Sequence, residues 1–188
     1  MRKLPWMLLL VAALAACEDP LEPLPWSDTP VKVRLWSIDR PEYMLMPSAF
    51  DFAAGTARIP EQPGASASWD VALAETADGL AFMPAGAYPG IETDPSIKPI
   101  TGTSFEALLE APGDIDTYVR SEPVPLAASG VYVVRTRRVP CGIFGATGYL
   151  YAKVRILELD PEDGTVLFEY VANANCNDRS FVPPESDG

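Results

Sequence analysis

Residues 149–172 read YLYAKVRILELDPEDGTVLFEYVA, and this stretch decides the fold class. Its two arms, residues 149–159 and 166–172, are rich in the β-branched and aromatic residues that favour strands. Between them, residues 160–164 (DPEDG) combine proline, glycine and acidic residues, which is typical of a turn. The stretch therefore predicts a β-hairpin of two antiparallel strands.

Two cysteines, Cys141 and Cys176, flank this hairpin. Pairing residues outward from the turn places Cys176 opposite about Gly148. The glycine-rich residues 142–148 need only fold back to bring Cys141 to the same place. The alternative, a reactive or metal-binding thiol pair, has no histidine to support it and no other cysteine besides Cys17 near the N-terminus. The sequence therefore predicts a disulfide that ties the loop before the hairpin to the chain after it.

Further strands are expected on the N-terminal side of the hairpin. Residues 131–138 (VYVVRTRR) form a β-branched run, and residues 31–38 (VKVRLWSI) alternate apolar and basic side chains. Residues 50–56 (FDFAAGT) read as a strand that enters a turn. Residues 69–75 (WDVALAE), with Trp69, Val71 and Leu73 on one face, precede Asp78-Gly79 and a return strand at residues 80–82.

The rest of the chain contains a long loop and one helical signal. Residues 84–102 hold four prolines and three glycines, which indicate an irregular loop. Residues 103–106 (TSFE) match a capping box and predict a short helix from about Ser104 to Glu110, ended by Pro112. The expected fold is a single, mainly β, antiparallel domain with one or a few short helices.

The N-terminus has the layout of an exported lipoprotein. Arg2 and Lys3 precede a short apolar run, and Leu14-Ala15-Ala16-Cys17 resembles a bacterial lipobox. We therefore expect residues 1–16 to be a signal peptide and Cys17 to carry diacylglycerol and a further acyl chain such as palmitate. Two or more acyl chains attach a protein stably to a lipid bilayer. Residues 17–30 then form the anchor and a proline-rich spacer, and residues 31–188 form the domain.

The composition excludes several functional classes. Removal of residues 1–16 would leave a net charge of −14, which disfavours nucleic acid as a partner. The chain has no histidine, so the commonest general base and the commonest zinc and haem ligand are missing. No catalytic motif or metal motif occurs, and we expect no enzyme, no catalytic residue and no metal site. A hydrolase built on the carboxylates of Asp114 and Asp116 is the weakest alternative, since both are expected in a solvated loop.

Methionine and aromatic residues are the remaining candidates for binding. Met44, Met46 and Met83 lie in or beside expected loops, with Phe82 and Tyr88 near in sequence. Thioether sulfur is a soft iron ligand, and aromatic rings suit the faces of a large planar ligand. Ordinary packing is the alternative for each methionine.

Five blocks together resemble the HmuY family of haem-binding envelope lipoproteins. Their order matches a phenylalanine-rich strand, a WD strand, an R-T strand and a tyrosine/lysine hairpin. The resemblance covers most of the chain after about residue 45. The blocks are FDFAAGT at residues 50–56, WDVAL at 69–73, YVVRT at 132–136, YAKVRIL at 151–157 and VLFEY at 166–170.

The resemblance implies a mostly β fold and a role in capturing haem and passing it to an outer-membrane receptor. Family members hold iron between two axial ligands from loops, histidine or methionine. Because this chain has no histidine, the resemblance points to Met83, with Met44 or Met46 as the second ligand. The location implied is the bacterial cell envelope, most simply the outer membrane. The alternative function is a structural or protein-interaction lipoprotein with no ligand pocket.

Overall fold

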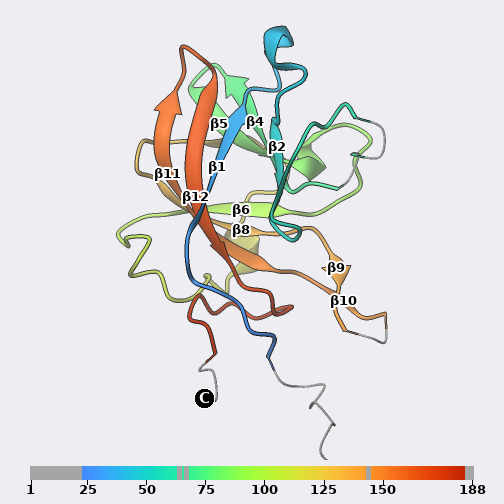
Figure 1. Ribbon diagram of the computed structural model, residues 1–188, viewed down its shortest axis with the longest axis vertical. Coiled ribbons are helices and arrows are strands. Elements are labelled where there is room, and N and C mark those ends of the chain that lie inside the picture. The colour runs from blue at the N-terminus through green and yellow to red at the C-terminus, as the bar shows by residue number, and fades with distance from the viewer. Residues whose placement is uncertain (1–22, 63–64, 66–67, 143–144, 185–188) are drawn as a thin grey trace, which may run out of the picture.

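The computed structural model describes residues 23–62, 65, 68–142 and 145–184. These residues form an antiparallel β protein with two five-stranded sheets and one two-stranded ladder (Figure 1). The helical elements of the described residues are single 3-10 turns: η1 (Pro41–Tyr43), η2 (Ala85–Ala87) and η3 (Ile115–Thr117). The prediction of a mainly β, antiparallel domain is confirmed.

The first sheet is built around the β-hairpin predicted at residues 149–172. Its strand order is β1-β12-β11-β8-β6, and Asp160 pairs with Thr165 at the tip of the β11–β12 hairpin. The predicted hairpin is therefore confirmed. A register shift between Ile156 and Glu158 places a bulge in β11, and bulges bend the strand that carries them. The strands are β1 (Val31–Trp36), β6 (Ser96–Ile100), β8 (Val131–Arg135), β11 (Tyr151–Asp160) and β12 (Thr165–Ala172).

The second sheet has the order β3-β2-β4-β5-β7. The predicted hairpin at Asp78-Gly79 is present, with Thr76 paired to Gly79. The ladder β9–β10 projects from the side of the molecule after β8 (Figure 1). The strands are β2 (Ala49–Asp51), β3 (Thr56–Arg58), β4 (Val71–Thr76), β5 (Gly79–Pro84), β7 (Val124–Pro125), β9 (Val139–Pro140) and β10 (Thr147–Gly148).

The main core lies between the two five-stranded sheets. Phe50 of β2 meets Phe168 of β12 edge to face, with ring centroids 5.6 Å apart, and Phe82 of β5 meets the same Phe168 ring at 5.6 Å. Edge-to-face contacts of this kind add about 0.5–1.5 kcal/mol each to the burial of the rings. In β1, Leu35 is fully buried in this core, whereas Val31 is 51% exposed at the other end of the strand.

The short helix predicted for residues 104–110 is absent, and that prediction is wrong. The capping contact does form, because the backbone N–H of Ala107 donates to the Ser104 hydroxyl. After one turn, however, the chain pairs with the C-terminal segment: Phe181 N–H donates to the Leu109 carbonyl and Ala111 N–H to the Arg179 carbonyl. Backbone groups used in this pairing cannot continue a helix. The segment instead packs Phe105 and Leu108 over the outer face of the first sheet.

Two smaller expectations also differ from the structure. The long loop predicted at residues 84–102 contains strand β6, which pairs with β8 because the chain returns to the edge of the first sheet. Val71 and Leu73 face the main core, but Trp69 packs with Ala49 and Ala72 on the opposite side of the second sheet. Trp69 precedes β4, so the alternation of the strand does not apply to it.

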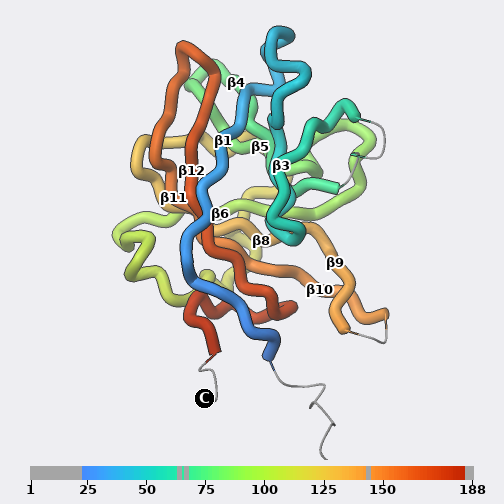
Figure 2. Tube along the Cα trace, viewed as in Figure 1, coloured from blue at the N-terminus to red at the C-terminus, as the bar shows by residue number. Residues whose placement is uncertain are grey.

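The N- and C-terminal segments leave the domain at the same end, opposite the coil of η1 (Figure 2). Part of the expected spacer contacts the domain. Leu24 exchanges two hydrogen bonds with the Asn175 side chain, and Trp26 packs against the apolar cluster that contains Phe105 and Leu108. Cys17 and the expected signal peptide lie outside the described residues. None of the helices among the described residues has the length and apolar character needed to cross a membrane.

Candidate functional site

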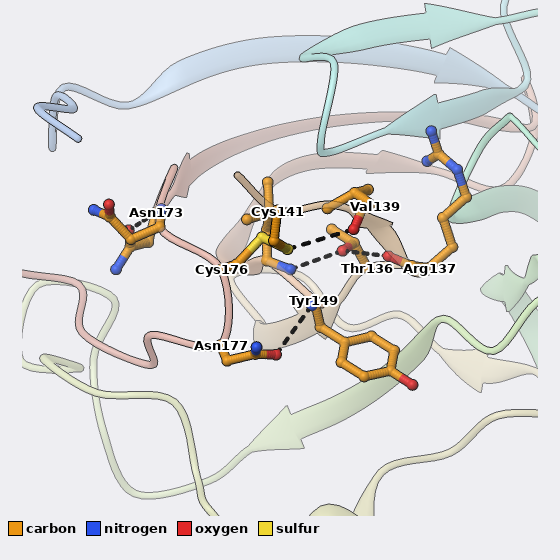
Figure 3. The surroundings of a disulfide bond; sticks show 10 residues. Thr136, Arg137, Val139, Cys141, Tyr149, Asn173, Cys176 and Asn177 are labelled. Atoms are coloured by element: carbon orange, nitrogen blue, oxygen red, sulfur yellow. Dashed lines mark hydrogen bonds between the residues drawn. A yellow bond between two sulfur atoms is a disulfide. The ribbon is translucent and has the colours of Figure 1, made fainter. Parts of the chain in front are cut away.

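A disulfide joins Cys141 and Cys176, as predicted, with 5.9 Å between their Cα atoms (Figure 3). It connects the segment after β9 to the chain just beyond β12. Asn177, next to Cys176, accepts a hydrogen bond from the backbone N–H of Tyr149 through its side-chain oxygen. The disulfide therefore fixes the position of the chain that leaves β12.

A buried cluster of two aspartates and one arginine lies close to the same end of β12. We call it the Asp–Arg cluster; it consists of Asp51, Asp70 and Arg137. The carboxylates are 1% and 0% exposed, and the Arg137 guanidinium lies 2.8 Å from Asp51 Oδ1 and 3.3 Å from Asp70 Oδ1. Paired buried charges of this kind resist separation because each partner would otherwise remain unsolvated.

The cluster also holds backbone groups in place. Asp70 accepts hydrogen bonds from the backbone N–H groups of Phe52 and Arg137, both at 2.8 Å. Asp51 accepts one from Ala54 at 3.0 Å. These contacts fix the turn at residues 52–55 that follows β2. Burial is the main influence on Asp70 and raises the pKa of its carboxyl to about 6.

The pKa of Asp70 predicts a pH-dependent stability. The folded carboxyl has a pKa of about 6 against a reference value of 3.8, so the folded state binds more protons between these values. The contribution to stability is therefore complete below about pH 4 and is lost as the pH rises through 6. Between pH 7 and pH 5, wild type should gain about 1 kcal/mol of unfolding free energy over D70N in urea titrations. An equal pH response in the two proteins would contradict the assignment.

A groove runs along the turn that the Asp–Arg cluster holds. One wall is the turn at residues 52–55, the second is the end of β12 and the chain after it, residues 170–174, and the third is the N-terminal segment at Ser27, Thr29 and Val31. Leu150 completes the lining, and the volume is about 400 Å³. Most of the side chains are apolar, and volumes of this order are typical of small-molecule sites.

Two residues shape the floor of the groove. Gly55 has a φ of +62°, and a Cβ at this position would lie 3.0 Å from the Tyr170 hydroxyl oxygen. Any other residue there would be strained in its backbone and crowded by Tyr170. Burial raises the pKa of Tyr170, so its phenol remains a neutral hydrogen-bond donor at neutral pH. The groove thus combines mostly apolar walls with the Tyr170 hydroxyl and the polar side chains of Ser27, Thr29 and Asn173.

The three candidate methionines lie away from the groove. Met83 sits within β5, where it pairs with Ala72, and is partly buried. Met44 follows η1 and is 67% exposed, and Met46 is partly buried in the same loop. None of the three lines the groove or the other depressions described for this structure. Iron ligation by these residues stays a prediction.

The structure also shows where the aromatic and acidic candidate residues lie. Phe82 is fully buried between the sheets, so the expectation that it covers a planar ligand is wrong, because its ring already contacts Tyr132 and Phe168. Tyr88 is partly buried edge-on against Trp69, with centroids 5.4 Å apart. Asp114 and Asp116 are exposed. No cluster of three or more metal-ligating side chains occurs in the described part of the chain.

The sequence reasoning missed the Asp–Arg cluster and the groove beside it. The cluster brings together residues from three segments: FDF at residues 50–52, WD at 69–70 and RTR at 135–137. The first two lie within blocks that carry the family resemblance, and the third overlaps the end of another such block. A usable signal was present, because an aspartate inside an apolar strand is costly unless it is paired. Asp51 ends the strand β2 and Asp70 directly precedes β4, both beside apolar residues, and an arginine is the natural partner.

Comparisons of the chain with models of known protein families, with curated proteins and with solved structures found no match.

Proposed function

We propose that this chain is a cell-envelope lipoprotein whose domain binds haem or a similar flat hydrophobic ligand in the groove. The observation that carries this proposal is the apolar lining of the groove, about 400 Å³, between residues 52–55 and residues 170–174. Sites of this kind bind by removing apolar ligand surface from water, with a few polar groups to orient the ligand. The resemblance to haem-binding lipoproteins favours a porphyrin.

The walls are held before any ligand arrives. The Asp–Arg cluster fixes the turn at residues 52–55, and the disulfide fixes the chain beyond β12. A preformed groove binds more tightly than a mobile one, because less conformational entropy is lost on binding. Contact with the walls, rather than ligation of iron, is then the main source of affinity. Ligation by Met83 would place the haem elsewhere on the domain.

The anchor supports an envelope location. An acylated Cys17 would hold the protein to a lipid bilayer, and the proposed site is the outer membrane. The groove is lined by Ser27, Thr29 and Val31, at the end of the domain from which the anchor segment leaves. A ligand bound there would lie near the membrane, and an outer-membrane receptor is the proposed acceptor.

The test is a titration of the full chain, purified in mild detergent, with haemin, dithionite-reduced haem and metal-free protoporphyrin IX. We expect saturable absorbance changes with all three. A54W places an indole in the groove at an exposed turn position and should weaken binding by at least about tenfold, or 1.4 kcal/mol. A128W, at an exposed position outside the lining residues, is the matched control and should bind as wild type does.

M83L separates the two modes of haem binding. If methionine ligates the iron, M83L weakens the binding of reduced haem, because thioether prefers ferrous iron. The binding of protoporphyrin IX, which has no iron, is then unaffected. If the ligand binds in the groove, A54W weakens the binding of all three ligands and M83L weakens the binding of none. Wild-type protein that binds none of the three would overturn the proposal.

One observation favours the alternative, a protein-interaction lipoprotein. Met44 and Leu45, which directly follow η1, are 67% and 79% exposed. The η1 coil lies at the end of the domain opposite the first and last described segments (Figure 1). Large exposed apolar side chains on a loop tip suit contact with a protein. If no ligand binds the groove, this loop is the proposed contact surface.

A further inference from the structure

Arg135 is a buried arginine without a carboxylate partner among the described residues. It is 7% exposed at the end of β8, and its Nε and Nη1 atoms have no hydrogen-bond partner. A buried guanidinium without acceptors is expensive, because its hydration is lost and nothing replaces it. Arg137, which is 17% exposed, is by contrast paired with Asp51 and Asp70. The contacts within the described chain therefore do not explain why Arg135 is buried without hydrogen-bond acceptors.

Two hydroxyl groups at and just before the start of β6 are also without partners. Ser96 pairs with Arg135 in the ladder between β6 and β8, so both side chains lie on the same face of the first sheet. Ser96 Oγ is buried without a partner, and so is Oγ1 of Thr93, three residues earlier. Arg135 and Ser96 thus place unpartnered N–H and O–H donors on one face of the sheet, and Thr93 adds another just before β6.

Tyr149 organises the surroundings of Arg135. The Arg135 guanidinium carbon lies 3.4 Å from the centroid of the Tyr149 ring, and that of Arg138 lies 5.4 Å from it. The Tyr149 hydroxyl donates to Asp94 Oδ2 at 2.7 Å and accepts from Arg138 Nε at 2.8 Å. Stacking on the ring recovers part of the cost of burying Arg135, but it leaves the N–H groups unbonded.

A depression opens beside these residues. Its volume is about 540 Å³, and its lining includes Thr93, Asp94 and Arg138, with Glu92 and Arg137. Asp94 is already hydrogen-bonded to Tyr149, and Arg137 belongs to the Asp–Arg cluster. Arg138 is thus the cation of the lining that remains for a ligand. Arg135 stacks on the Tyr149 ring, whose hydroxyl contacts the lining residues Asp94 and Arg138. Among the unpartnered donors, Thr93 lines the depression directly, and Arg135 adjoins it through Tyr149.

We propose that Arg135, with Ser96, Thr93 and Arg138, binds an anionic group, a carboxylate or a phosphate, that enters through this depression. Such a group carries only acceptor oxygens, and so it matches a set of donors that lack acceptors. The planar guanidinium binds either group through two parallel hydrogen bonds. The groove of the proposed function is lined by other residues, and this site stands or falls independently of it.

The test is calorimetric titration of the full chain in detergent with inorganic phosphate and, separately, with acetate. We expect a saturable heat with at least one of the two anions, and the responding anion identifies the chemistry. R135M should weaken binding by about tenfold to hundredfold, the value of hydrogen bonds to a charged group. R34M removes an exposed arginine of β1 and is the matched control.

R135K shows whether weaker anion binding results from the lost guanidinium or from a loss of folding. It keeps the charge but lacks the two-pronged geometry, so binding should weaken while the thermal unfolding temperature stays close to that of wild type. Without anion, R135M should be at least as stable as wild type, because an unpaired buried charge has been removed. Equal anion binding by R135M and wild type, or no saturable heat with either anion, would overturn the proposal. Buried water would then satisfy the donors.

Discussion

R137M should lower the free energy of unfolding by about 3–5 kcal/mol, the cost of removing one partner from a buried ion cluster. The substitution leaves the carboxylates of Asp51 and Asp70, which are 1% and 0% exposed, without their common guanidinium. Arg58 cannot replace it, because it is 36% exposed and lies 3.4 Å from Asp51 alone. Urea unfolding at pH 7, followed by tryptophan fluorescence, measures the loss.

R34M provides the control for this prediction. Arg34 pairs with Glu158 on the surface, where the two side chains are 40% and 60% exposed. Exposed pairs of this kind contribute about 0–1 kcal/mol. Adding D70N to R137M should restore part of the lost stability, because one uncompensated charge is removed. Equal losses from R137M and R34M would show that the Asp–Arg cluster does not stabilise the fold.

Loss of the disulfide is the second large effect. Replacing Cys141 and Cys176 with alanine should cost about 2–4 kcal/mol, because the unfolded chain regains the freedom of the loop between them. The two cysteines are 35 positions apart in the sequence, and a closed loop of that length restricts the unfolded chain considerably. The same variant should also weaken ligand binding in the groove, since the chain beyond β12 would no longer be fixed.

The redox state of the chain provides the control. Dithiothreitol should lower the stability of wild type to that of the double alanine variant and leave the variant unchanged. A thiol titration of denatured, unreduced C17S should find no free thiol. Two free thiols per chain would show that the bond between Cys141 and Cys176 does not form in the expressed protein.

The strands and their turns could be predicted from local sequence because their signals are local. The arms of the β11–β12 hairpin are rich in β-branched and aromatic residues, and its turn contains Pro161 and Gly164. Pairing outward from that turn was enough to predict the disulfide. The same local reasoning failed at residues 104–110, where the capping signal at Ser104 was real but pairing with Arg179 and Phe181 determined the structure.

The groove and the Asp–Arg cluster depend on contacts between distant parts of the chain. Asp51 and Arg137 are 86 positions apart, and Asp70 and Arg137 are 67 apart. Strand periodicity says which face a residue occupies, but it does not say which strands become neighbours.

The sequence by itself determined the fold class, the central hairpin and the disulfide; lipidation of Cys17 stays a prediction. Only the tertiary structure decided that Phe82 lies in the core, that Met83 lies apart from the groove, and that Arg135 has no partner. Strands and turns follow from the conformational preferences of neighbouring residues. The groove and the buried polar clusters follow instead from tertiary contacts, which bring together side chains that no local pattern connects.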